Sequence, residues 1–141
     1  MGVGDLMAKI EFPGVEDYVK QLKQLGADID GIIKYACYDA AGMVADAVKA
    51  NTPVDSGDLR SSIALTPYRN DNGFINTKLM FDGYDSRGVP NAIKARVLES
   101  GNSTHRKHPF VRPAVNRVKN SAVRSIEDQL NKKINELMKG S

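Results

Sequence analysis

The strongest constraint on the fold is a long stripe of apolar residues in the first half of the chain. From Ile29 to Val48, apolar side chains recur every three or four residues over about five turns, which is the spacing of one face of an amphipathic α-helix. Asp28 can cap the start of this helix, and Asn51 and Pro53 mark its end. Many positions inside it are Ala or Gly, so another element can approach closely. The sequence therefore predicts a long N-terminal helix packed against a neighbouring element.

A second apolar stripe extends toward the end of the chain. Pro113 suits the first turn of a helix, because its missing N–H would have no partner there. One face then carries apolar side chains at positions 115, 118, 122, 126, 130, 134 and 137. A shorter helical pattern covers residues 15–25, and residues 92–99 fit either a short helix or a strand. We therefore expect a long C-terminal helix and a short helix near the N-terminus.

Residues 62–81 carry the pattern of a β-hairpin. Two strand-like stretches flank Asp71-Asn72-Gly73, a sequence typical of tight turns. A two-residue loop would pair Leu65 with Met80, whereas a three-residue loop with Gly73 in the left-handed conformation would pair Leu65 with Leu79. The three-residue loop gathers the apolar side chains of both strands on one face, and the hydrophobic pattern should decide the register. We therefore predict the three-residue loop with a bulge.

These patterns together predict an α+β fold in a single domain that covers residues 1–141. It would contain the long N-terminal helix, an antiparallel sheet that includes the 62–81 hairpin, and the C-terminal helix. Pro67 has no N–H to donate, so its strand is expected at an edge of the sheet. A chain of 141 residues, 41% of them hydrophobic, can bury a core without disulfides or a structural metal. Residues 1–10 are expected to be a flexible N-terminal segment, in which Met7 could be an alternative start.

Charge is distributed unevenly along the chain. The formal net charge is +3, from 20 Lys and Arg against 17 Asp and Glu. Residues 1–86 contain 8 Lys and Arg against 13 Asp and Glu, a net charge of −5, whereas residues 87–141 contain 12 against 4, a net charge of +8. This asymmetry indicates either charge-complementary self-association or a basic patch that faces nucleic acid. The plain alternative is two solvated faces that contact no polyanion.

The basic excess is concentrated between residues 94 and 124. This segment holds eight Lys and Arg and one acidic residue, Glu99. Arg106 and Lys107 lie in a polar loop and could contact either DNA phosphates, without reading bases, or an adjacent subunit. A sequence-independent DNA-binding module is therefore one hypothesis for the function. Arg112, flanked by prolines and a phenylalanine, is better explained as a structural anchor.

The residue patterns favour no catalytic, cofactor-binding or metal site. His105 and His108 are the only histidines, and no cysteine or clustered carboxylate accompanies them as metal ligands. The lone cysteine, Cys37, falls inside the long helical stripe and is expected to be a buried, inert thiol. No apolar run approaches the ~18 residues of a membrane-spanning helix, and the N-terminus does not resemble a secretory signal. We expect no enzymatic activity, no cofactor and no membrane contact.

Two stretches resemble the motifs of a family of tailed-bacteriophage proteins. Residues 52–63 read T-P-V-D-S-G-D-L-R-S-S-I, which is similar to the family signature T-P-V-D-T-G-x-L-R-x-S-I. Residues 98–102 and 108–114 resemble its E-x-G-T and P-F-x-R-P-A elements. The family comprises minor tail-component or head–tail joining proteins, also described as neck or tail-completion proteins, of long-tailed phages and prophages. The residues that carry the resemblance are Pro53, Val54, Asp55, Ser56, Gly57, Leu59, Arg60, Glu99, Gly101, Pro109, Phe110, Arg112 and Pro113.

The resemblance implies a structural role in the virion. It implies a ring, expected to be hexameric, at the neck or the top of the tail tube, with DNA in its lumen. The implied partners are further copies of the chain and the adjacent connector, tail-terminator or tail-tube proteins, and no catalytic residue is implied. An acidic face of one subunit could meet a basic face of the next in a heterologous contact that closes the ring. We expect the loops 82–91 and 102–108 to make contacts between subunits or between rings.

Overall fold

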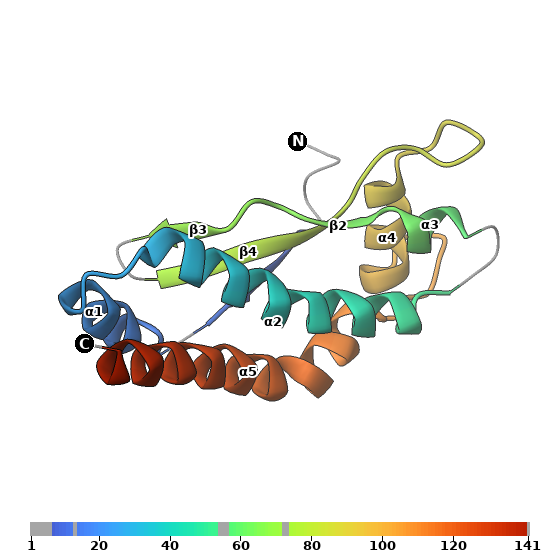
Figure 1. The fold of residues 1–141 in the computed structure, drawn as a ribbon. Helices are drawn as coiled ribbons and strands as arrows, with labels where there is room; N and C mark the ends of the chain where they lie inside the picture. Colours follow the sequence, from blue (N-terminus) through green and yellow to red (C-terminus); the bar gives the residue numbers. More distant parts are fainter. Residues whose placement is uncertain (1–6, 13, 54–56, 72–73, 141) are drawn as a thin grey trace.

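The fold combines a small antiparallel sheet with long helices (Figure 1). The computed structural model describes residues 7–12, 14–53, 57–71 and 74–140. The elements in chain order are β1 (Met7–Glu11), α1 (Glu16–Gln24), α2 (Ile29–Asn51), α3 (Asp58–Ser61), β2 (Ile63–Leu65), β3 (Arg69–Asp71), β4 (Phe74–Phe81), α4 (Asn91–Ser100) and α5 (Val111–Lys139). The predicted α+β class is confirmed, with the two long helices at the positions that the apolar stripes indicated.

Helices α2 and α5 run antiparallel along each other (Figure 1). Ile33, Ala40, Ile126 and Leu130 of these helices have no exposed surface. Helix α2 also contacts β2 and β4, so its small residues are covered by the sheet as well as by α5. Asp28 caps the start of α2, since its carboxylate accepts a hydrogen bond from the N–H of Gly31 (3.5 Å). The two helices and the sheet therefore share one hydrophobic core.

Strand β4 is the centre of the sheet. It pairs with β1 on one side and with β2 and β3 on the other, always antiparallel. The prediction of a flexible segment over residues 1–10 is wrong for residues 7–10, which belong to β1; residues 1–6 lie outside the described part of the chain. Ile10 and Phe12 are buried in the core, and this burial stabilises a strand that is too short to show a clear sequence pattern.

The hairpin contains two registers. Near the turn Asp71 pairs with Phe74, which leaves two residues between the strands, so the predicted three-residue loop is wrong. Further from the turn Leu65 pairs with Leu79, the register that the apolar pattern favoured. The stretch between these two ladders is one residue longer on the edge strand than on β4, which makes a bulge around Pro67. A residue without an N–H fits a bulge on an edge strand, because no ladder hydrogen bond is lost there.

The segment that fitted either a helix or a strand is helix α4. It contacts β4 and α3, and it buries Asn91, Ala92, Ala95 and Glu99 on one face. The three- and four-residue spacing of these buried positions explains why the helix is preferred once the sheet is present. Among the described helices, none combines the length and the apolar character that crossing a membrane requires.

Candidate functional site

The stretches that carry the motifs meet at one end of the fold, where α5 begins. Asn51, the last residue of α2, donates from its side-chain amide to the carbonyl oxygen of Phe110 (2.9 Å). Arg60 of α3 donates from its Nε to the carbonyl oxygen of Lys49 (3.1 Å). Helix α4 contacts α3, and its Glu99 reaches the first residues of α5. We call this region the motif junction, made of residues 49–53, 57–62, 98–101 and 108–113.

Glu99 is the buried carboxylate of the motif junction. One oxygen accepts hydrogen bonds from the backbone N–H groups of Phe110 and Val111, both at 2.8 Å, and the other accepts from the N–H of Arg112 at 2.9 Å. The first N–H groups of a helix have no partner within it, and the N-cap residue Phe110 makes no side-chain cap of its own. A carboxylate at this position also interacts favourably with the helix dipole. Glu99 therefore caps α5 from helix α4 and connects the two helices.

Gly101 lets the chain fold back at the end of α4. Its φ is 74°, and its N–H donates to the carbonyl oxygen of Val97 (2.7 Å). Beyond it the chain returns, so that the N–H of His108 donates to the carbonyl oxygen of Leu98 (2.6 Å). A Cβ atom at Gly101 would lie 2.9 Å from the backbone nitrogen of Lys107, closer than such atoms normally approach. Only glycine suits this position, on both conformational and steric grounds.

Replacing Gly101 with alanine is expected to lower the free energy of unfolding by about 2 kcal/mol, because the backbone is strained and the loop must shift. The matched control is Gly42→Ala, inside helix α2, where a Cβ atom would meet nothing within 4 Å. That change should stabilise the protein by up to about 1 kcal/mol, since alanine is the better helix former. Urea denaturation of both variants measures the difference; a neutral Gly101→Ala variant would contradict the prediction.

The described part of the first motif stretch includes Gly57 and the short helix α3 that follows it. Gly57 has a φ of 84°, in the left-handed region, and precedes α3 directly. Leu59 of α3 belongs to the core, whereas Pro53 is exposed. The remaining residues of this stretch, Val54, Asp55 and Ser56, lie outside the described part of the chain. Between α2 and the sheet, the described residues of the motif thus include Gly57 in the left-handed conformation and the buried Leu59.

The last motif stretch anchors the start of α5. Phe110 is buried, and its ring packs edge-to-face against that of Phe81 in β4, with 5.7 Å between the ring centroids. Pro113 lies in the first turn of α5, as its missing N–H predicted. Pro109 and Arg112 are exposed, although the backbone of Arg112 is held by Glu99. The start of α5 is therefore fixed both by an aromatic contact and by hydrogen bonds.

Two residues of the motif junction, Asn51 and Thr52, make contacts that the sequence did not indicate, although Asn51 was expected to mark the end of the helix and Thr52 begins the motif. Asn51 joins the end of α2 to the start of α5, as described above. Thr52 is buried, and its hydroxyl donates to the carbonyl oxygen of Val48 (2.6 Å). Polar side chains at a helix end commonly satisfy backbone groups that the helix leaves unpaired. Their position at the end of the apolar stripe is the signal that could have identified them.

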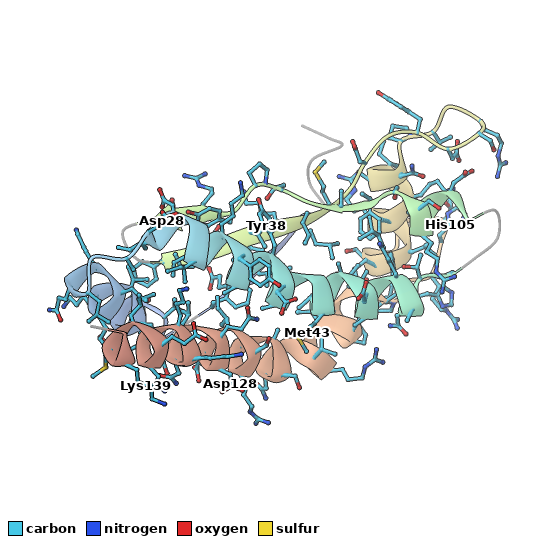
Figure 2. All side chains as sticks on the ribbon, viewed as in Figure 1. Asp28, Tyr38, Met43, His105, Asp128 and Lys139 are labelled. Atoms are coloured by element: carbon cyan, nitrogen blue, oxygen red, sulfur yellow. The ribbon has the colours of Figure 1, made fainter. Side chains whose placement is uncertain are left out.

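Loop 102–108, which carries Arg106 and Lys107, lies next to the motif junction. The side-chain oxygen of Asn102 accepts hydrogen bonds from the N–H groups of Thr104 (2.9 Å) and His105 (2.7 Å), which closes the loop into a compact turn. Arg106 and Lys107 are exposed on this turn. Figure 2 shows His105 of the loop at the opposite end of the molecule from Asp28. The positive charges of Arg106 and Lys107 therefore lie on a hydrogen-bonded turn at one end of the protein.

The histidines and the cysteine do not form a reactive centre. His105 and His108 are both exposed, and Nδ1 of His105 lies 3.2 Å from the side-chain oxygen of Asn102. Among the residues that the structure describes, no group of three or more His, Cys, Asp or Glu could hold a metal ion. Cys37 has no exposed surface, and burial raises its pKa to about 12. Because the thiolate is the reactive form, this cysteine is inert in the folded protein.

Most of the loop 82–91 is exposed, and Asp85 closes it. The carboxylate of Asp85 accepts hydrogen bonds from the N–H groups of Val89 and Arg87, both at 2.9 Å. The ammonium group of Lys94 lies 3.2 Å from the same carboxylate. These interactions, the hydrogen bond from Val89 above all, lower the pKa of Asp85. The loop is therefore an internally bonded turn on the surface.

We expect this loop to open in acid. Hydrogen bonds hold the pKa of Asp85 below its ordinary value of about 3.9, so the stability they contribute is complete above about pH 4. It is lost as the pH falls through the lowered pKa, because protonation removes the charge that the amides solvate. The amide proton shifts of Arg87 and Val89, followed by NMR, should report this midpoint, and Asp85→Asn should abolish it. A midpoint at or above the ordinary value would contradict the prediction.

The described motif residues cap, connect and bury the ends of helices, so in this structure they hold the fold together. Comparison with protein-family models matches residues 16–101 to a family described as "Bacteriophage HK97-gp10, putative tail-component". The match covers more than half of the chain, and the chain belongs to this family of bacteriophage tail components. The resemblance inferred from the motifs is thereby confirmed at the level of a structural component of the phage tail. A search of the curated proteins and a search of the solved structures each found no match.

Proposed function

We propose that this protein joins the phage head to the tail, or completes the top of the tail, as a hexameric ring around the DNA channel. The observation that carries the proposal is the separation of charge within a member of a tail-component family. The loops at one end expose Arg87, Arg106 and Lys107 with one aspartate, Asp82, whereas helix α2 exposes three aspartates with one lysine, Lys34. A ring needs two different, complementary surfaces on each subunit. Opposite charges on the two surfaces favour the correct pairing and speed up association.

The ring would have no catalytic activity, and its partners would be other structural proteins. Its neighbours along the particle axis would be a connector on the head side and a tail-terminator or tail-tube protein on the tail side. Cations that remain free of subunit contacts would face the phosphates of the DNA in the lumen. Such contacts are independent of base sequence, which suits a channel through which the whole genome passes.

The direct test is to delete the gene from the phage that encodes it. We expect DNA-filled heads and separate tails by electron microscopy, with infectivity restored by the protein supplied from a plasmid. Purified wild-type particles should contain the protein at a few copies each, in a multiple that fits a ring. Normal joined particles from the deletion phage, or particles without the protein, would overturn the proposal.

Reversing two charges in loop 102–108 should impair assembly without unfolding the protein. The variant Arg106→Glu/Lys107→Glu is expected to reduce the titre of infectious particles at least tenfold, because repulsion replaces attraction at the contact. Its melting temperature should stay within about 2 °C of the wild type, since both side chains are exposed. The matched control Lys20→Glu/Lys23→Glu makes the same change in net charge on exposed residues of α1. Equal titres of infectious particles for the two variants would show that assembly does not depend on the charges of loop 102–108 in particular.

The second candidate function is sequence-independent DNA binding by the free protein. The observation that favours it is the run of exposed cations Arg106, Lys107, Arg112, Arg117 and Lys119 at and after loop 102–108. Affinity for duplex DNA should then fall steeply as salt is added, in proportion to the number of phosphates contacted. Absence of binding at low salt would reject DNA binding as an activity of the protein alone.

A further inference from the structure

We infer that, in the proposed ring, the 82–91 loop of each subunit docks into the groove between helices α2 and α5 of the next copy. This inference depends on the proposed function, since it assigns the two surfaces that a ring of identical subunits must bring together. It is argued from the shape of the groove, from the form of the loop, from their complementary chemistry and from their positions on the molecule.

The groove follows the outer side of the contact between α2 and α5. It consists of two hollows of about 670 Å³ and about 520 Å³, which share Tyr35 and Gln129. Apolar atoms of Ala27, Ile32 and Leu137 line the larger hollow. Tyr35, which lines both hollows, is 73% exposed, so the fold leaves its large side chain largely uncovered. Exposed apolar surface of this kind marks interaction sites.

The 82–91 loop is a protrusion whose shape is set before binding. It extends from the body beside α4 (Figure 1). Tyr84 is 70% exposed and Val89 is 39% exposed. Tyr84 bridges to Pro90, and the N–H of Asp85 donates to the carbonyl oxygen of Val89 (2.8 Å), so the apolar side chains stand on a closed turn. A pre-organised loop loses little conformational entropy on docking.

The two surfaces are complementary in chemistry. The loop offers a tyrosine, a valine and the exposed Arg87, and tyrosine and arginine are typical of the residues that dominate binding energy at interfaces. The α2 side of the groove contributes Asp28 and Asp39 to its rim. The α5 side carries both signs, and its Lys133 is paired with Glu136 (3.9 Å). The loop can therefore place its apolar side chains in the groove while Arg87 faces one of these two aspartates.

The loop and the groove lie at different ends of the molecule, which permits a head-to-tail contact between copies. A symmetric pair, in which each loop meets the groove of the other copy, would give a cross-linked dimer and no longer products. The loop projects at the end where α3 and α4 lie, whereas the larger hollow lies near the start of α2 and the end of α5, at the other end (Figures 1 and 2). Contacts between different patches on identical subunits propagate from head to tail and close into a ring when the rotation allows it.

The test is cysteine cross-linking in assembled phage particles. Tyr84→Cys and Tyr35→Cys are introduced separately and together, and a short bis-maleimide is added; both positions are exposed, and the native Cys37 is buried and inert. The double variant should give a ladder of cross-linked multimers of the chain, and each single variant should give monomer only. Val89→Cys with Gln129→Cys provides a second pair if the tyrosine positions affect folding, which thermal melting of the purified variants would show.

The outcomes separate this inference from the proposed function. If both double-cysteine variants are present in particles but neither gives a ladder, the inference is overturned. The proposed ring is not affected by that result. Cross-linking by Tyr84→Cys alone, or to a different virion protein, would also overturn it, because the loop would then meet another loop or another partner. Wild-type particles that lack the protein would overturn the proposed function itself.

Discussion

Replacing Glu99 with alanine is expected to lower the free energy of unfolding by about 3 kcal/mol. The substitution removes the acceptor of three N–H groups at the start of α5, two of which belong to the buried residues Phe110 and Val111. An unpaired buried donor costs about 1–3 kcal/mol, and water can reach only the N–H of Arg112 readily. Urea denaturation followed by circular dichroism measures the loss as a lower midpoint with an unchanged slope.

Two variants separate the cap from a general effect of charge. Glu99→Gln keeps one acceptor oxygen but loses the negative charge, so we expect about half the loss, ~1.5 kcal/mol. Glu136→Ala removes a glutamate from α5 whose side chain is 54% exposed, and the expected change is within about 0.5 kcal/mol. Equal losses in Glu99→Ala and Glu136→Ala would show that Glu99 is not a cap.

Replacing Phe110 with alanine is expected to cost about 3–5 kcal/mol, the range for removing a large aromatic side chain from a core. The ring is 2% exposed and packs against Phe81, so its loss leaves a cavity between the sheet and the start of α5. The cavity also weakens the site where Glu99 binds the helix start. The melting temperature, measured by calorimetry, should fall by roughly 10 °C or more for a chain of this length.

The matched control for Phe110 is Phe74→Ala in strand β4. Phe74 is 64% exposed, so the same truncation removes little buried area and should cost less than about 1 kcal/mol. Both variants lose a phenylalanine, and the main difference between the two side chains is burial. Similar losses for the two variants would contradict the packing of Phe110 described here.

The elements that the sequence predicted correctly are those whose signal is local. Helix α2 follows from an apolar period that is repeated over many turns, and its Asp28 cap follows from a residue type at one position. The pairing of Leu65 with Leu79 follows because a shift by one residue would turn every apolar side chain to the wrong face. In each case the information lies within a single stretch of chain.

The elements that the sequence missed or left open depend on a partner elsewhere in the chain. Residues 7–10 become a strand because β4 is beside them, and the predicted bulge lies around Pro67 because two registers must be reconciled. Residues 92–99 become a helix because one of its faces is covered by β4 and α3. A short pattern is compatible with several structures until its neighbour is known.

The motif residues were located by resemblance, and their contacts required the tertiary structure. The sequence places Glu99 two residues before Gly101 and the Phe110–Pro113 stretch further along the chain. It does not indicate that the Glu99 carboxylate accepts hydrogen bonds from three N–H groups of that stretch. Likewise Asn51 could be seen as the end of a helix, but its hydrogen bond to Phe110 joins residues far apart in the chain. Long-range hydrogen bonds have no periodicity that could be recognised in the sequence.

The sequence by itself determined the two long helices, the hairpin, the family and the acidic and basic parts of the chain. These depend on local periodicity, residue type and composition, which do not require knowledge of the fold. The tertiary structure decided the strand β1, the cap on α5 and the placement of the charged loops at one end. It also decided that Tyr35 and Tyr84 stand on exposed surfaces at separate places. These features depend on which residues, distant in the sequence, pack in the same core. Burial and long-range hydrogen bonds form only when the chain folds.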